Sequence, residues 1–305
     1  MLNLTRIHHI CQVVPALAPQ TELLEGLFGF RCQHTWTDEG QGHRGALFGV
    51  PGRSGVAWQV LEPTAAEGPL RAFLDSPRGP GLHHVAVEVP ALEAALTELQ
   101  ALGIAPAARA GNGGEAWADV SLVPPGGPAG LMFRLVEGAA ADAEAPPAPG
   151  AGLGIVAVDH VCQAYRDRDE LARLLERVLG MQELWRTPDG KHEDLADLVL
   201  RIPGEQMFWE IIQPVGEGSF IGRFLETRGA AAHHATFEVA DWDKAMAACE
   251  QAGIPTFDPN SGETDGAHWN DAFIHPKHTG GVLVQLFWEE KPGVWVRSDK
   301  IPSGR

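Results

Sequence analysis

The sequence predicts an α+β fold in which one β-α-β-β-β unit occurs four times. Two observations predict it: short motifs recur at a nearly constant offset between the two halves, and each half itself contains two similar segments. In every segment a β-rich alternating stretch precedes a helical one, whose apolar residues recur at three- and four-residue spacing. Because one unit cannot bury both faces of a curled sheet, we expect pairs of units to form two cup-shaped modules with mixed sheets.

The two halves of the chain are duplicates of each other. RIHHICQVV near the start resembles AVDHVCQAY past the middle, and this match places His9 and His160 151 residues apart. Trp58 and Trp209 show the same offset of 151. The segment between the halves is rich in Ala, Pro and Gly, which is typical of a linker. We therefore predict an N-terminal module over residues 1–137, a linker over 138–153, a C-terminal module over 154–292 and a tail over 293–305.

Each half divides again into two similar units. LHHVAVEV resembles the opening strand of the first half, and HHATFEV resembles the opening strand of the second. A helical stretch follows each of the four opening strands and ends at a glycine, a residue that often terminates helices. These stretches cover residues 21–29, 91–103, 169–180 and 241–253. Three further strands follow each helix, and in the last unit they lie near IPTFD, AHWNDAFIHP and GVLVQLFWE.

Composition and charge exclude several classes of protein. The chain has 305 residues, of which 44% are hydrophobic, so it can bury a core in each of two domains. The net charge of −17 argues against broad contact with nucleic acid or anionic membrane, which needs clustered Lys and Arg. No apolar run approaches the roughly 20 residues of a membrane helix, and the N-terminus lacks the layout of a signal peptide. We therefore predict a cytoplasmic protein with free cysteines, which show no CxxC spacing.

A histidine on the first strand and a polar residue on the fourth recur in every unit. The polar residues interrupt the otherwise apolar strands VAWQVLE, LMFRLVE, MFWEIIQ and VLVQLFW. Side chains alternate along a strand, so each polar residue points to the face opposite its neighbours. A buried polar group is costly without a partner, and polar groups that converge from two units therefore favour a bound cation. The pairs are His9 and Gln59, His84 and Arg134, His160 and Glu210, and His234 and Gln285.

The second half supplies a complete set of ligands for one metal ion. The predicted ligands are His160, Glu210, His234 and Gln285. They provide two imidazole nitrogens, a carboxylate and an amide oxygen, which suit a borderline divalent ion such as Zn, Co, Ni, Mn or Fe. Open positions on such an ion can bind two vicinal oxygens of a small-molecule substrate.

The first half lacks such a set because Arg134 takes the place of an oxygen donor. A guanidinium is permanently cationic and has no lone pair to donate, so it would repel a metal ion. We interpret this half as a degenerate module without metal. Two roles remain open for Arg134: it binds a substrate carboxylate, or it pairs with an internal acid. His83 and His233 precede their partner histidines and point the other way, and we interpret them as structural.

The recurring histidines and strand-four residues resemble those of the vicinal-oxygen-chelate superfamily. This group includes glyoxalase I, extradiol dioxygenases, fosfomycin-resistance proteins and methylmalonyl-CoA epimerase. The resemblance covers both halves and implies tandem βαβββ modules around a divalent ion. Three short stretches, IHPKHTGGVLVQLFW, AHHATFEV and GLHHVAVEV, are similar to the epimerases in particular.

The sequence departs from these relatives in the position of the acid. The epimerases usually carry Gln on the earlier fourth strand and Glu on the last, whereas here Glu210 comes first and Gln285 last. The charge of the ligand set is the same in both arrangements. Extradiol and hydroxyphenylpyruvate dioxygenases, which also have two cups, need the acid on the last strand, and glyoxalase I usually has Glu at both positions. Gln285 therefore counts against these two groups.

The resemblance to the epimerases implies proton abstraction next to a carbonyl, with the metal as a Lewis acid that holds the resulting enolate. It places a general base within KHEDLADLVLRIP, where the candidates are Glu193 and Asp197, although both could be surface charges. The reaction would be that of an isomerase or epimerase, or of a glyoxalase-like lyase. The substrate would be an acyl thioester, a 2-oxo acid or another compound with vicinal oxygens.

Two other functions remain open. Two histidines and one carboxylate also form the facial triad of non-haem iron enzymes, so oxygen chemistry of the extradiol type is the first alternative. The second is a protein that sequesters a small molecule in its cup without metal. We expect a small-molecule partner, allow for a homodimer, and expect neither nucleic acid nor a membrane as a partner.

Overall fold

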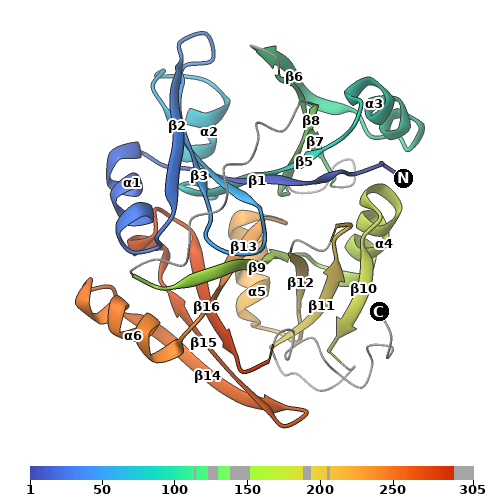
Figure 1. Ribbon diagram of the computed structural model, residues 1–305. Coiled ribbons are helices and arrows are strands. Elements are labelled where there is room, and N and C mark those ends of the chain that lie inside the picture. Colours follow the sequence, from blue (N-terminus) through green and yellow to red (C-terminus); the bar gives the residue numbers. More distant parts are fainter. Residues whose placement is uncertain (113–114, 123–129, 138–151, 188–193, 205–206, 292–305) are drawn as a thin grey trace. The chain divides into compact units, whose positions relative to one another are not determined.

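The computed structural model describes residues 1–112, 115–122, 130–137, 152–187, 194–204 and 207–291 (Figure 1). Its strands form two sheets of eight, each accompanied by helices. The predicted α+β class with two cup-shaped modules is therefore confirmed. None of the helices in these residues is long and apolar enough to cross a membrane.

The first sheet is built from the N-terminal half in the order β2-β3-β4-β1-β5-β8-β7-β6. The first strands of the two β-α-β-β-β repeats in this half, β1 and β5, therefore lie side by side at the centre of the sheet. The β5–β8 pair is parallel, whereas the pairs on either flank are antiparallel, so the sheet is mixed. The strands are β1 (Arg6–Val13), β2 (Arg31–Asp38), β3 (His43–Gly49), β4 (Ala57–Pro63), β5 (Gly81–Glu88), β6 (Pro106–Asn112), β7 (Glu115–Ser121) and β8 (Met132–Glu137).

The second sheet repeats this topology with the C-terminal half. Its order is β10-β11-β12-β9-β13-β16-β15-β14, so β9 and β13 occupy the central positions that β1 and β5 hold in the first sheet. The β13–β16 pair is parallel, as is β5–β8. The strands are β9 (Ile155–Ala164), β10 (Gln182–Arg186), β11 (Leu195–Arg201), β12 (Phe208–Pro214), β13 (Ala232–Val239), β14 (Thr256–Thr264), β15 (Ala267–Ile274) and β16 (Leu283–Glu289).

Each predicted helix lies between the first and second strand of its unit, which confirms the fourfold β-α-β-β-β order. These four helices are α1 (Leu17–Gly26), α3 (Leu92–Ala101), α4 (Arg168–Leu179) and α6 (Trp242–Gln251). The sequence did not predict two additional helices, α2 (Pro69–Leu74) and α5 (Phe220–Arg228), or the short 3₁₀ turn η1 (Pro276–His278). The helices α2 and α5 connect the two units within each half, where the chain passes from a fourth strand to the next first strand.

The glycines that follow the four predicted helices have a left-handed backbone. Their φ angles are 70° at Gly29, 76° at Gly103, 70° at Gly180 and 67° at Gly253. At Gly180 the N–H group donates to the Glu176 carbonyl and closes the last turn of α4. A side chain with a Cβ would be strained there, which explains why the helix period and the glycine together predict the helix end.

In three of the four repeats, a side chain of the fourth strand binds the first turn of the helix of the same repeat. This side chain lies three residues after the polar residue that is predicted to point inward. It accepts a hydrogen bond from the first backbone N–H of the helix, one of the donors that a helix leaves without an internal partner. The same spacing of 45 residues separates donor and acceptor in three units. The pairs are Leu17 with Glu62, Leu92 with Glu137 and Arg168 with Gln213. This contact fixes each helix on the strand that carries the candidate site residue.

Contacts divide the chain into two compact units that each combine parts of both sheets. The first consists of residues 1–11, 83–142 and 162–232, and the second of residues 12–82, 143–161 and 233–305. These units combine separate segments of the chain, whereas the domains predicted from the sequence are continuous ranges. The predicted domain limits remain a prediction.

The first compact unit joins the second and third β-α-β-β-β repeats. The rings of Phe133 and Trp209 lie 5.2 Å apart between their centroids. The Leu131 N–H group donates to the Ala230 carbonyl. Apolar side chains of β8 and β12, the fourth strands of these two repeats, thus belong to the core of the first compact unit.

The second compact unit joins the first and fourth repeats. Phe237 packs against the rings of Phe30 and Trp58, with centroids 5.6 and 5.5 Å away. The amide of Gln12 donates to the Thr279 carbonyl at 2.8 Å. Aromatic packing and a buried polar link therefore both hold this unit together.

Candidate metal centre

Three of the four predicted metal ligands lie together on β9, β13 and β16. The Nε2 atoms of His160 and His234 are 3.3 Å apart. The Thr236 hydroxyl oxygen lies 2.8 Å from His160 Nε2 and 2.7 Å from Gln285 Oε1. Thr236 pairs directly with Gln285 in the parallel register, and His234 stands two residues before it on the same face. Sheet register therefore explains why these side chains meet.

Asp159 fixes the orientation of the His160 ring. Its Oδ2 atom lies 2.6 Å from His160 Nδ1, and both side chains are buried. A carboxylate accepts, so we assign the imidazole proton to Nδ1, which leaves the lone pair on Nε2 directed at the group above. A histidine held in this way by a carboxylate is the arrangement that metal-binding histidines usually show.

Two atoms of this group carry lone pairs that suit a cation. The Thr236 hydroxyl lies 2.8 Å from His160 Nε2 and donates to Gln285 Oε1 at 2.7 Å. Thr236 and His234 are buried, so an ion held here would be shielded from water. The donor set of imidazole nitrogens and an amide oxygen fits a borderline divalent ion.

Asp271 is a partly buried acid beside Gln285 that the sequence analysis missed. The Gln285 amide nitrogen donates to its carboxylate, which turns the amide oxygen toward Thr236 and His160. Burial raises the pKa of Asp271 to about 6, although hydrogen bonds from Asn260 and Gln285 oppose the shift. A repeated pattern could have revealed this residue, because the Trp-x-Asp of Trp269 and Asp271 also occurs in the first half.

Glu210, the fourth predicted ligand, lies on β12 and is buried. Its carboxylate accepts a hydrogen bond from the thiol of Cys162. Burial and this carboxylate both raise the pKa of Cys162, so the thiol keeps its proton. Cys162 stands two residues after His160 on β9, and side chains two residues apart share a face of the strand. The role of Glu210 as a metal ligand remains a prediction.

Apolar side chains of α5 cover the neighbourhood of Glu210. Ile221 and Leu225 pack against Ile212, Cys162 and Ala164. Ile212 follows Glu210 by two residues and shares its face of β12. The acid therefore lies in surroundings of low polarity, where its interaction with a cation is strong.

Asp197, one of the two candidate bases, lies on β11 on the same face as Glu210. Val199 pairs directly with Glu210, and Asp197 stands two residues before Val199. The other candidate base, Glu193, lies outside the described residues. The roles of both remain predictions.

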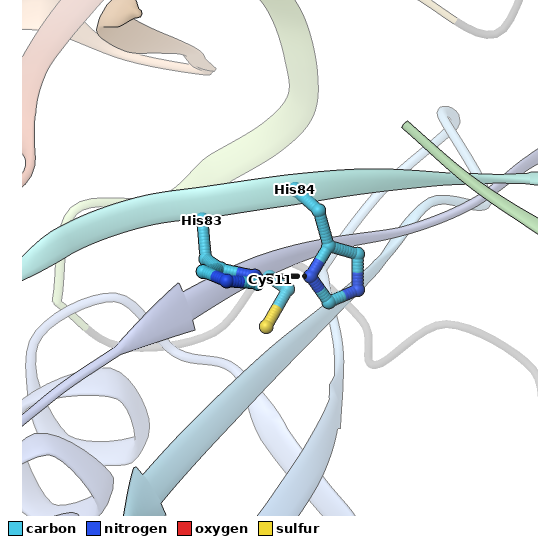
Figure 2. A group of neighbouring side chains, drawn as sticks. All are labelled: Cys11, His83 and His84. Carbon is cyan, nitrogen blue, oxygen red and sulfur yellow. Dashed lines mark hydrogen bonds between the residues drawn. The ribbon is translucent and has the colours of Figure 1, made fainter. Parts of the chain in front are cut away.

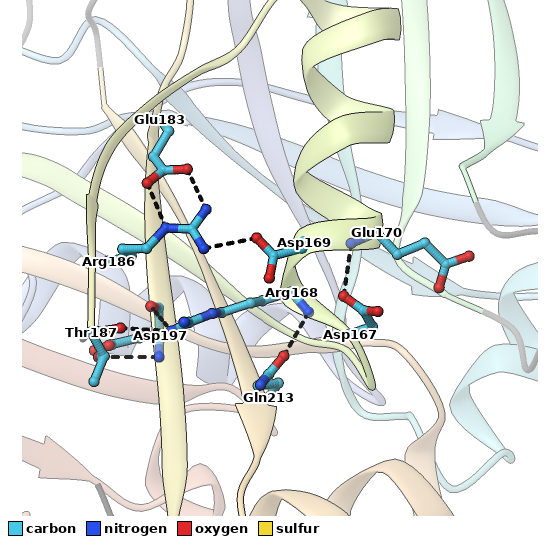
Figure 3. Close-up of polar contacts among 9 residues, drawn as sticks. All are labelled: Asp167, Arg168, Asp169, Glu170, Glu183, Arg186, Thr187, Asp197 and Gln213. Carbon is cyan, nitrogen blue, oxygen red and sulfur yellow. Dashed lines mark hydrogen bonds and ion pairs between the residues drawn. The ribbon is translucent and has the colours of Figure 1, made fainter. Parts of the chain in front are cut away.

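A buried arginine holds the backbone at Asp197 in place (Figure 3). The guanidinium of Arg168 donates to the carbonyls of Thr187 and Asp197 at 3.2 and 2.8 Å. The Thr187 hydroxyl accepts from the Asp197 N–H group at 3.3 Å. These bonds connect the end of β10 with β11, so the position of Asp197 is supported independently of its own side chain.

In the first half, Arg134 pairs with an internal acid. Its Nε and Nη2 atoms donate to the two carboxylate oxygens of Asp119 at 2.6 and 3.0 Å, and its guanidinium lies 3.9 Å from the centre of the Trp117 ring. This is the second of the two roles that the sequence left open, and binding of a substrate carboxylate by Arg134 remains a prediction. His9 and His84 keep the Nε2 separation of 3.3 Å that their counterparts have in the second half.

The chain belongs to the Glyoxalase/Bleomycin resistance protein/Dioxygenase superfamily. The sequence model of this family matches residues 8–120 and 159–273, once in each half and over more than half of the chain. The resemblance described above is therefore confirmed at the level of the superfamily.

Curated relatives with sequence similarity include epimerases. Over 132 residues the chain is 33% identical to the ethylmalonyl-CoA/methylmalonyl-CoA epimerase of Cereibacter sphaeroides, an alignment that covers 42% of this chain and 95% of that enzyme. It is 30% identical over 132 residues to the mitochondrial methylmalonyl-CoA epimerase of Homo sapiens, covering 42% of this chain and 72% of that enzyme. These relatives are enzymes, and each aligns with less than half of this chain.

Solved structures similar over nearly the whole chain include a synthase and a dioxygenase. A triple mutant of 4-hydroxymandelate synthase from Streptomyces coelicolor has a TM-score of 0.69 and 15% identity, covering 94% of this chain and 93% of that one. The 2,3-dioxygenase LapB from Pseudomonas sp. KL28 has a TM-score of 0.61 and 16% identity, covering 96% of each chain. At such identity the likeness shows a shared fold alone.

Proposed function

We propose that the protein is a metal-dependent isomerase that removes a proton from the carbon next to the carbonyl of an acyl thioester. The observation that carries this proposal is the group formed by His160, Thr236 and Gln285, in which the Asp159 carboxylate lies 2.6 Å from the Nδ1 atom of the histidine. His234 lies beside this group, and the predicted fourth ligand is Glu210. When bound, a divalent ion supplies positive charge next to the carbonyl oxygen of the substrate and makes the adjacent C–H bond more acidic.

In this proposal the protein supplies the proton acceptor and the dry surroundings. Asp197 takes the proton from the carbon, while the electron pair of the C–H bond moves toward the carbonyl oxygen. Return of this proton from Asp197 to the same face restores the substrate, whereas protonation of the opposite face by a second donor, such as water, gives the epimer. The two hydrogen bonds from Arg168 keep the backbone at Asp197 fixed during this transfer. Glu193 is the alternative acceptor.

The relatives by sequence suggest the first substrates to test. The Cereibacter sphaeroides enzyme is by name an ethylmalonyl-CoA/methylmalonyl-CoA epimerase, and it is aligned over 95% of its length. The malonyl group of such a substrate has two carboxyl-derived oxygens that can approach one ion together. We therefore propose a 2-alkylmalonyl thioester as the substrate class, and a homodimer remains a prediction.

Deuterium exchange tests this function directly. The metal content of the purified protein is measured first, and the protein is then incubated with methylmalonyl-CoA in D₂O under strict anaerobiosis. We expect about one divalent ion per C-terminal module and a mass gain of one deuteron at the carbon between the carbonyls. Removal of the ion with a chelator should abolish exchange, and adding the ion back should restore it. Exchange that persists in metal-free protein would contradict the proposal.

Oxygen chemistry is the second candidate function, and the residue types of the predicted ligand set favour it. His160, His234 and Glu210 would serve as a facial triad for ferrous iron. Oxygen consumption with a catechol under ferrous iron, without deuterium exchange of an acyl thioester, would favour this candidate. A protein that binds a small molecule stoichiometrically without any metal would instead be a sequestering protein.

Replacing Asp159 by asparagine tests the role of the carboxylate behind His160. We expect the variant to bind divalent zinc or cobalt about 10- to 100-fold more weakly, because the carboxylate both orients the ring and makes it more basic. Competition against a chelating dye measures the affinity. His8→Asn is the matched control, since His8 holds the equivalent position beside His9 in the first half. Equal affinity in the two variants would contradict the role of Asp159.

A further inference from the structure

Cys11, His83 and His84 form a cluster in the first half, and none of them belongs to the candidate metal centre (Figure 2). One ligand atom from each residue lies within 4.8 Å of the other two. Cys11 and His84 have no solvent exposure, and His83 is half-buried. The thiol comes from β1 and the imidazoles from the neighbouring β5, so two adjacent strands of one sheet hold all three ligands.

The imidazoles of this cluster are already gathered by contacts with each other. The Nδ1 atoms of His83 and His84 are 2.8 Å apart, and the Nε2 atoms of His84 and His9 are 3.3 Å apart. Two nitrogens bound to one tetrahedral ion are separated by about 3.3 Å, given metal–nitrogen bonds of about 2.0–2.1 Å. The Nδ1 atoms of His83 and His84 would therefore need to move apart by about 0.5 Å to share an ion.

The positive charge of Arg134 near this cluster is partly balanced by Asp119. The Asp119 carboxylate accepts two hydrogen bonds from the guanidinium, so the pair is neutral as a whole. The prediction that Arg134 excludes a metal ion from this half assumed that Arg134 itself stood at the ligand position. Here the third ligand is Cys11 on β1, and the strand-four residue is not needed.

We infer that Cys11, His83 and His84 form a second metal site, built for a thiophilic d¹⁰ cation. One thiolate and two imidazoles are the soft and borderline ligands that monovalent copper and zinc accept. Monovalent copper balances the charge of the thiolate, whereas divalent zinc leaves one positive charge in buried surroundings. The site therefore favours monovalent copper over zinc. It differs from the candidate centre in position, ligand chemistry and oxidation state of the ion.

Competition for copper tests this inference without reference to activity. Chelator-treated protein is titrated with monovalent copper in the presence of bicinchoninate, without oxygen, and the bound copper is examined by X-ray absorption. We expect one tightly bound equivalent with a copper–sulfur contact, and weaker binding of zinc to the same site. Cys11→Ser should lose this equivalent and the sulfur contact. His83→Gln should weaken binding while leaving the sulfur contact in place.

Two matched variants make the result specific. Cys249→Ser removes a buried cysteine of α6 that belongs to none of the ligand groups found in the described residues, and it should bind copper like the unchanged protein. Cys162→Ser removes the matched cysteine of the second half. Comparison with Cys11→Ser therefore shows which of the two cysteines binds the copper. Circular dichroism shows whether each variant is folded. Folded Cys11→Ser that keeps the tight equivalent, or zinc that outcompetes copper at this cysteine, would overturn the inference.

Discussion

Replacing His160 by alanine is expected to remove the divalent ion from the C-terminal module and the deuterium exchange together. Asp159 directs the Nε2 lone pair of His160 at Thr236 and His234, so no other side chain of the group can take its place. Electrophilic stabilisation by a metal is worth several kcal/mol, and a loss of about 4 kcal/mol corresponds to roughly a thousandfold in rate. Metal analysis of the purified variant and exchange in D₂O measure the two effects.

The duplicated fold provides the control for this variant. His9 is the counterpart of His160 at an offset of 151, lies equally deep in its sheet, and has the same Nε2 separation from its neighbouring histidine. His9→Ala therefore makes a cavity of the same kind in the first half, and we expect it to keep the divalent ion and the exchange activity. Loss of activity in both variants to the same extent would indicate a general loss of stability. Retention of the ion in His160→Ala would contradict the ligand assignment.

The fold could be predicted from the sequence because its signals are local and repeated. The helix period followed by Gly103, Gly180 or Gly253 identifies helix ends, since the backbone there has a positive φ angle. The alternation around Glu210 and Gln285 identifies which face of a strand each side chain occupies. Repetition at an offset of 151 residues strengthens the prediction of each strand and helix, because the same pattern occurs in both halves.

The neighbours of the candidate ligands could not be predicted in the same way. Thr236 meets Gln285 through the register between two parallel strands, and that register is not encoded in either strand alone. Asp271 reaches Gln285 from β15, although its own strand looks like an ordinary alternating one. Asp159 is adjacent to His160 in sequence, yet only the side-chain geometry shows that the two neighbours turn toward each other.

The short helices and the contact units were also beyond sequence analysis. α5 has nine residues, and its two buried side chains, Ile221 and Leu225, give too short a period to distinguish a helix from a loop. The division into compact units depends on which repeats pack together. Phe237 against Trp58 and Phe133 against Trp209 are contacts between repeats that no local pattern specifies.

Replacing Asp197 by asparagine is expected to lower the exchange rate by about 10²- to 10⁴-fold, which is the usual contribution of a positioned general base. The metal content should stay unchanged, because Asp197 is not among the proposed ligands. The substitution keeps the size of the side chain, and the Arg168 bond to the Asp197 backbone carbonyl does not depend on it. The fold should therefore be retained, and the measured rate reports the missing carboxylate. Exchange per bound ion, compared between variant and unchanged protein, is the measurement.

Glu193→Gln provides the decisive comparison, because it alters the other candidate acid without altering the backbone that Arg168 holds. If Asp197 is the proton acceptor, Glu193→Gln should exchange at nearly the normal rate, whereas Asp197→Asn should not. The reverse result would assign the base to Glu193. Equal, small effects in both would mean that neither carboxylate takes the proton. The next proton acceptor to test would then be Asp271, because its carboxylate accepts a hydrogen bond from the proposed ligand Gln285.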